Sequence, residues 1–118
     1  MLTATTYWYY LTLSRLGRTA GAKALLAPIT SDMEIIENGS YYRLLRLYKG
    51  EVAAESFTGA AGLDAVTTTY GLARWHAMEG RDEQATTLLR EIVDGHAQQW
   101  PAFAYIAAEA ELARKAVR

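Results

Sequence analysis

Between Thr67 and Val93 the chain carries two successive helical patterns of apolar positions, separated by a short polar joint. Small and apolar side chains recur at Leu72, Ala73, Ala77 and Met78 before the joint, and at Ala85, Leu88, Leu89, Ile92 and Val93 after it. An apolar position that returns at i, i+3, i+4 and i+7 turns one face of a helix toward a core. The joint at residues 79–81 contains Gly80, so the pattern predicts an antiparallel helical hairpin.

Related patterns precede this hairpin. Residues 2–16 read as a helix that is apolar on more than one side and therefore needs neighbours on more than one side. A second helix follows, with Thr19 as its predicted cap and Pro28 near its end. After a polar connection at residues 30–38, where Ile35 and Ile36 are expected to pin the chain to the core, a third helix is predicted to Tyr48.

The pattern also predicts the remaining elements. A short fourth helix is expected over residues 52–57, ended by Gly59 and Gly62. The fifth helix is expected from Asp64, as its cap, to Gly80, and the sixth from Asp82 to Gly95. Pro101 is placed in the first turn of a final helix, whose expected buried side chains are Trp100, Phe103, Ala104, Ala107, Ala108 and Leu112.

The glycines at the predicted joints are regularly spaced. Gly17, Gly50 and Gly80 lie 33 and 30 residues apart. A period near 34 residues with two helices per unit is typical of tetratricopeptide-like solenoids, in which each hairpin must stack on its neighbours to bury its apolar face.

The residues around these joints resemble the tetratricopeptide repeat (TPR) family. That motif has an aromatic residue, a Leu-Gly pair and a Tyr on its first helix, a Gly at the turn, and Ala, an aromatic residue and Ala on its second helix. The third unit matches at Leu72, Ala73, Gly80 and Ala85, and departs from the motif at His76, Leu89 and Ile92. The first unit matches at Gly17, Ala22 and Leu26, with Leu13 where Tyr is usual.

The other units match less completely. The second keeps Gly50 but has Glu55 where Ala is usual, and the final helix matches at Trp100, Phe103 and Ala104. The C-terminal part is also similar to the end of certain bacterial TPR-containing proteins. The resemblance implies one all-α domain over residues 1–118, a right-handed superhelix of three hairpins at about 3–34, 36–62 and 64–95, with a capping helix at 98–116.

In a TPR stack the first helices of successive units line a concave groove. The resemblance places seven side chains in that groove: Tyr7, Trp8, Tyr41, Tyr70, Arg74, Tyr105 and Glu109. Rigid aromatic rings beside an Arg suit the binding of a peptide or protein segment, because they offer contact area at low entropic cost. In the alternative interpretation the rings pack between helices and the groove is only a surface. The Lys and Asn residues that clamp a terminal carboxylate in some TPR domains are absent.

Composition excludes several classes. With 51% hydrophobic and 21% charged residues the chain is not a disordered one. Its net charge of −1 and scattered basic residues do not favour nucleic acid or an anionic membrane. No apolar run approaches a membrane span. Without cysteine there is neither a disulfide nor a thiolate metal site, so the sequence leaves the compartment open, the cytoplasm being favoured and a secreted or periplasmic parent being the alternative.

Candidate chemistry is sparse. His76 with Glu79 at i, i+3 makes at most half of a metal site, and we expect His76 to pack in place of the motif Tyr. Asp82 and Glu83 are better explained as favourable charges at a helix N-terminus than as an acid–base pair. We therefore expect no catalytic residues, metal or cofactor.

The sequence leaves three functions open. The first is a non-enzymatic scaffold that binds a peptide or protein segment in the aromatic groove. The second is self-association through the open N-terminal helix, and the third is an accessory or regulatory part of a larger bacterial protein.

Overall fold

The computed structural model describes residues 2–30, 39–57, 62–95, 98 and 103–116. Within these ranges the regular secondary structure is helical, and no strand is present. The helices are α1 (Leu2–Arg15), α2 (Thr19–Leu26), α3 (Gly39–Lys49), α4 (Gly62–Met78), α5 (Asp82–Gly95) and α6 (Phe103–Ala116), with a short 3-10 helix, η1 (Ala54–Ser56), after α3. The all-α prediction is confirmed.

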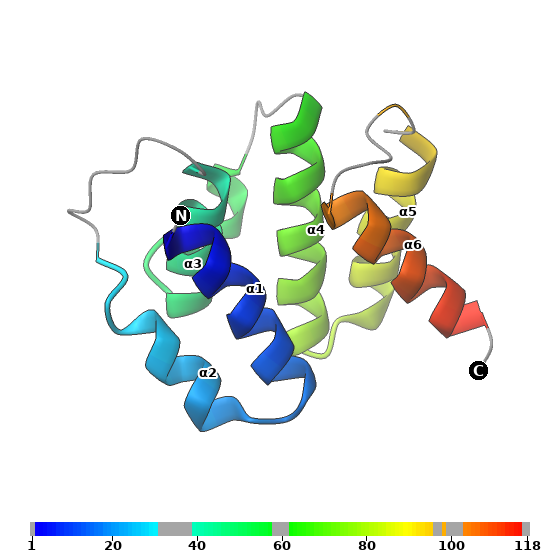
Figure 1. Cartoon of the computed structure of the whole chain (residues 1–118). Coiled ribbons are helices and arrows are strands. Elements are labelled where there is room, and N and C mark those ends of the chain that lie inside the picture. The colour runs from blue at the N-terminus through cyan, green and yellow to red at the C-terminus, as the bar shows by residue number, and fades with distance from the viewer. Residues whose placement is uncertain (1, 31–38, 58–61, 96–97, 99–102, 117–118) are drawn as a thin grey trace. The chain divides into compact units, whose positions relative to one another are not determined.

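The chain forms two compact units, Met1–Phe57 and Thr58–Arg118 (Figure 1). The first contains α1, α2 and α3, and the second contains α4, α5 and α6. In each unit the first two helices form a hairpin and the third helix packs against both of them. The two halves of the chain therefore share one plan, hairpin plus third helix, although their sequences differ.

The three predicted glycine joints have the same backbone geometry. Gly17, Gly50 and Gly80 have φ values of 78°, 90° and 81°, in the left-handed region that residues with a Cβ rarely adopt. At Gly80 the amide donates to the carbonyl of Ala77 at 3.1 Å, and the next amide, that of Arg81, donates to His76 at 2.8 Å. This pair of bonds is a Schellman motif, which ends a helix by satisfying its last carbonyls.

The same two bonds recur at the other joints. Gly17 donates to Ser14 at 3.1 Å and Arg18 donates to Leu13 at 2.9 Å. The Gly50 amide donates to Leu47 and the next amide to Arg46, both at 2.9 Å. The glycine period predicted from the sequence is therefore a period of identical helix ends.

The core of the first unit is built from one face of each of its helices. It contains Tyr7, Tyr10 and Leu11 from α1, Ala22 and Leu26 from α2, and Tyr42, Leu44, Leu45 and Leu47 from α3, together with Ile29. The Nζ of Lys49 donates to the carbonyl of Ile29 at 2.6 Å. The hydroxyl of Tyr42 donates to the backbone carbonyl of Thr30. These bonds hold the segment after α2 against α3.

The core of the second unit follows the predicted spacing closely. Ala73 on α4, Ala85 on α5 and Ala104 on α6 are all buried, which lets the helix axes approach. Larger side chains fill the remaining space: Val66, Tyr70, Leu89, Ile92 and Tyr105.

Three local predictions are wrong. Asp64 does not cap the fifth helix, because α4 begins two residues earlier, at Gly62. The expected fourth helix is only the single 3-10 turn of η1. Ala53 before it is extended, with φ −84° and ψ 145°, and Phe57 after it leaves the helical region, with φ −88° and ψ 78°. Thr19 does not cap α2, since it is the first helical residue; Arg18 stands at the cap position and makes no side-chain capping bond. The end of α2 before Pro28 agrees with the prediction.

The final helix departs from its predicted buried face at Phe103. Ala104 and Ala108 are buried as expected, but Phe103 is 73% exposed. Tyr105 and Glu111 are buried in addition, because α6 meets α4 and α5 through the face that carries Ala104 and Ala108. The predictions for Ile35, Ile36, Gly59, Trp100 and Pro101 lie outside the described residues.

Candidate functional site

An aromatic cluster joins α1 to α3 in the first unit. Tyr7 is fully buried at its centre, with ring centroids 4.7 Å from Tyr41 and 5.0 Å from Trp8. Tyr48 stacks on Tyr7 at 6.1 Å and on Tyr10 at 5.1 Å. Edge and offset contacts of this kind stabilise a cluster beyond simple area burial and hold each ring in one orientation.

Trp8 and Tyr41 form the half-buried rim of this cluster. The Nε1–H of Trp8 donates to the hydroxyl of Tyr41 at 3.3 Å, across 33 residues of sequence. The two ring planes meet at 67° with centroids 6.3 Å apart. Of the three groove residues predicted in this unit, Trp8 and Tyr41 are therefore partly exposed, whereas Tyr7 is buried against both of them.

In the second unit α4 and α6 are joined by a buried polar cluster. The hydroxyl of Tyr70 donates to Oε1 of Glu111 at 2.6 Å, and Nη1 of Arg74 lies 3.2 Å from Oε2 of the same carboxylate. The side chains of Arg74 and Glu111 are only 12% and 7% exposed. Tyr70 and Arg74 thus bind the same carboxylate. Hydrogen bonds to a charged group are stronger than those between neutral groups, so they stabilise this buried carboxylate.

The two other predicted groove residues lie elsewhere in this unit. Tyr105 is buried, and its hydroxyl donates to the carbonyl of Val93 on α5 at 3.3 Å. Glu109 is exposed on α6 and takes no part in the Arg74 contact. The carboxylate that meets Arg74 is Glu111, two residues further along the helix.

Sequence reasoning missed Glu111, although a signal for it exists. Ala104, Ala108 and Glu111 follow one another at i, i+4 and i+7, so they share one face of a helix. A carboxylate on the same face as two closely packing alanines must be buried, and a buried carboxylate needs a cation or several donors.

A second polar cluster lies at the joint between α4 and α5. Nε of Arg81 donates to Nδ1 of His76 at 2.8 Å, and the guanidinium lies 4.6 Å from the ring centroid of Trp75. The Trp75 and His76 rings meet edge to face at 5.0 Å. Burial, and then the positive charge of Arg81, hold the pKa of His76 below its ordinary value. His76 is therefore a packed neutral imidazole that accepts a hydrogen bond.

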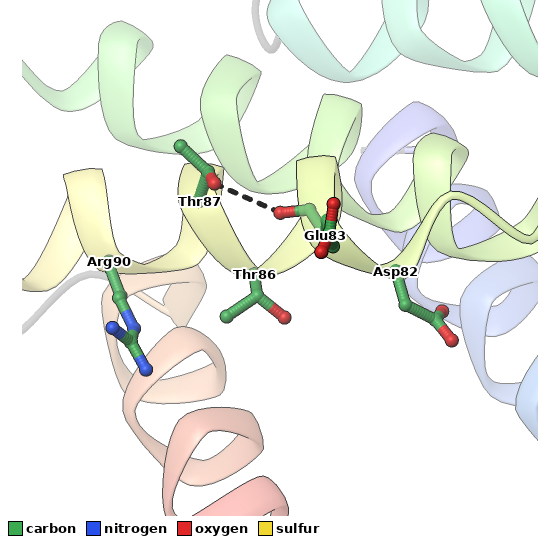
Figure 2. A pocket seen from close by; sticks show the side chains of 5 residues that line it. All are labelled: Asp82, Glu83, Thr86, Thr87 and Arg90. Carbon is green, nitrogen blue, oxygen red and sulfur yellow. Dashed lines mark hydrogen bonds between the residues drawn. The ribbon is translucent and has the colours of Figure 1, made fainter.

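The outer face of α5 carries a shallow pocket (Figure 2). Asp82 and Arg90 lie at its two ends with Thr86 between them, and the hydroxyl of Thr87 is occupied by the Glu83 carbonyl at 3.0 Å. Acid–base work requires a carboxylate held in a cleft with a tuned pKa. The acidic and basic side chains here are exposed on one helix and lie far apart, so this geometry does not support that chemistry.

Two other classes of site find no support in the described part of the chain. No group of three or more His, Cys, Asp or Glu side chains that could hold a metal ion occurs there. No helix among the described residues is long and apolar enough to cross a membrane.

Comparisons with known proteins leave the candidate site to be judged on its geometry. No family model, no curated protein and no solved structure matches the chain.

Proposed function

We propose that the chain is a TPR-like helical-repeat scaffold that binds a peptide or protein segment against the first and third helices of a unit. The shared plan of the two units supports this proposal. In each unit a hairpin closed by a left-handed glycine is followed by a helix that packs on both members. Successive TPR units stack in this order, so a right-handed superhelix is the arrangement we propose for the whole chain.

The Trp8–Tyr41 pair is the observation that carries the binding proposal. Both rings are half-buried, fixed to each other by a hydrogen bond, and supported by the buried ring of Tyr7. Rigid aromatic side chains that already hold their bound orientation lose little entropy when a ligand packs on them. A ligand side chain that is apolar or planar would gain most from this surface.

The corresponding face of the second unit offers different chemistry. Arg74 there is neutralised by Glu111, and Tyr70 donates to the same carboxylate. This cluster stabilises the contact of α4 with α6. It would therefore shape the surface that a ligand meets, without offering a free charge to the ligand. We therefore place the energetic centre of binding on the α1/α3 face.

The test begins with peptides selected from a random library on the whole chain. Their affinities are then measured for the wild type and for the variants Trp8→Leu and Tyr41→Leu, which keep an apolar side chain at each position. Loss of a central aromatic contact should weaken binding by roughly tenfold or more.

Tyr9→Leu is the matched control, because Tyr9 lies on the same helix and is 53% exposed outside the aromatic cluster. Its affinity should stay within about twofold of the wild type. The proposed binding face would be rejected if all three variants bound the peptides as tightly as the wild type, or if no peptide could be selected.

A further inference from the structure

The exposed face of α6 carries a second apolar stripe. Phe103 and Ile106 are 73% and 50% exposed, and Ala110 and Ala113 are exposed on the same side. The opposite side of the helix, with Ala104, Tyr105, Ala108 and Glu111, already packs within the second unit. An apolar surface of this kind on a folded protein commonly marks an interface.

The spacing of the stripe is that of a coiled coil. Phe103, Ile106, Ala110 and Ala113 follow one another by three, four and three residues. These are successive a and d positions of a heptad, the seam through which two helices pack together. The residues that pack within the unit occupy the positions that are usually exposed in a coiled coil. One helix thus offers one face to its own unit and the other to a partner helix.

The charges beside the stripe indicate which helix and which orientation fit. Glu109 occupies the g position and Arg114, five residues later, occupies the next e position; both are exposed. In a parallel pair the g residue of one helix faces the following e residue of the other. Two copies of α6 in parallel would therefore place Glu109 of each opposite Arg114 of its partner, twice by symmetry. An antiparallel pair would not bring these opposite charges together.

We propose that two copies of this chain associate through a parallel, two-fold contact of their α6 helices. This contact is separate from the peptide-binding face and does not depend on it. The helix of 14 residues is about 21 Å long, so the interface is smaller than the standard size for stable complexes. The dimer should accordingly be weak, with a dissociation constant on the order of 100 µM.

The first experiment measures the mass of the whole chain by sedimentation equilibrium from about 10 µM to about 2 mM. The mass should rise from one chain of 13.1 kDa toward two. Ile106→Glu should keep the chain at one copy throughout, while Tyr9→Ser on α1 should leave the association unchanged. Far-ultraviolet circular dichroism checks that each variant remains helical, which we expect because both side chains are at least half exposed.

The second experiment tests the orientation by exchanging charges. Glu109→Arg and Arg114→Glu should each weaken self-association by roughly fivefold, because each sets like charges against one another in two places. An equimolar mixture of the two variants should associate at least as well as the wild type, since each positive pair then meets a negative pair. The double variant should also return to within about twofold of the wild type.

The possible results divide cleanly. A single-chain mass at all concentrations, or a dimer that Ile106→Glu leaves intact, overturns the proposal. A dimer abolished by Tyr9→Ser would place the contact on α1 instead. A dimer that needs Ile106 but ignores the charge exchanges would overturn the parallel arrangement. Because peptide affinity is measured separately, failure here leaves the binding proposal standing.

Discussion

Tyr70 and Glu111 are 41 residues apart in the chain, and the hydroxyl of one donates to the carboxylate of the other at 2.6 Å. The bond links α4 to α6 inside the second unit, and Arg74 completes the site with its contact at 3.2 Å. Neither Arg74 nor Glu111 is more than about an eighth exposed. A charge buried to this degree is stable only while its partner remains, so the pair holds the two helices in one register.

Replacing Glu111 by Gln should lower the free energy of unfolding by about 3 kcal/mol, because the positive charge of Arg74 would stay buried without a counter-ion. Urea denaturation monitored by circular dichroism measures this loss. Glu109→Gln is the matched control on the same helix; its side chain is exposed, so its effect should stay within about 0.5 kcal/mol. Similar losses in both variants would mean that the buried pair contributes nothing specific.

Gly80→Ala tests the repeated helix end. At φ 81° an added Cβ meets no atom within 4 Å, so any loss must come from the backbone conformation itself. We expect a loss of about 1–2 kcal/mol, and a smaller one for Gly80→Asn, because Asn tolerates the left-handed region.

Gly39→Ala provides the comparison for this substitution. Gly39 begins α3 without a positive φ, and its added Cβ also meets open space. Alanine at that position should be neutral or stabilising by up to about 1 kcal/mol. If thermal melts showed the same change for both glycines, the left-handed joint would not be the cause.

The features that sequence predicted well are those with a local cause. A positive φ acts on one residue, so Gly17, Gly50 and Gly80 could be assigned as joints from their spacing alone. The buried positions of α5 were also readable, because Ala85, Leu89 and Ile92 lie on its single apolar face.

The features that sequence missed depend on distant packing. Helix α6 is apolar on two sides, and only its contacts with α4 and α5 decide that Phe103 faces outward. The burial of Glu111 beside Arg74, which lies 37 residues earlier in the chain, depends on the same packing. Periodicity identifies an apolar face, but it cannot tell which of two faces meets the rest of the unit.

Ala85→Leu tests the close approach of the helices in the second unit. Ala85 is 1% exposed, so three further carbon atoms would force α5 away from its neighbours. We expect a loss of about 1–3 kcal/mol in the free energy of unfolding. Ala20→Leu on α2, where the residue is exposed, should change it by no more than about 0.5 kcal/mol. An unchanged or raised melting temperature for Ala85→Leu would contradict the tight contact.

The His76–Arg81 contact predicts a pH dependence of stability. Burial and the charge of Arg81 lower the pKa of His76 in the folded chain, while the unfolded chain keeps an ordinary value of about 6.5. Above that value His76 is neutral in both states, and its contribution to stability is fully present. As the pH falls below it, the unfolded chain takes up the proton first, so the free energy of unfolding decreases until the folded pKa is passed.

Protonation would also remove the acceptor that Nδ1 offers to Arg81 and place two positive charges side by side. Glu83 of α5, which lines the pocket beside His76, is exposed and offsets this repulsion only weakly. Urea midpoints between pH 7.5 and about pH 5 should therefore fall in the wild type, and the His76→Gln variant should lose the part of that slope near pH 6. Glutamine retains an acceptor for Arg81 but cannot titrate. An unchanged slope in His76→Gln would therefore show that other groups cause the pH dependence.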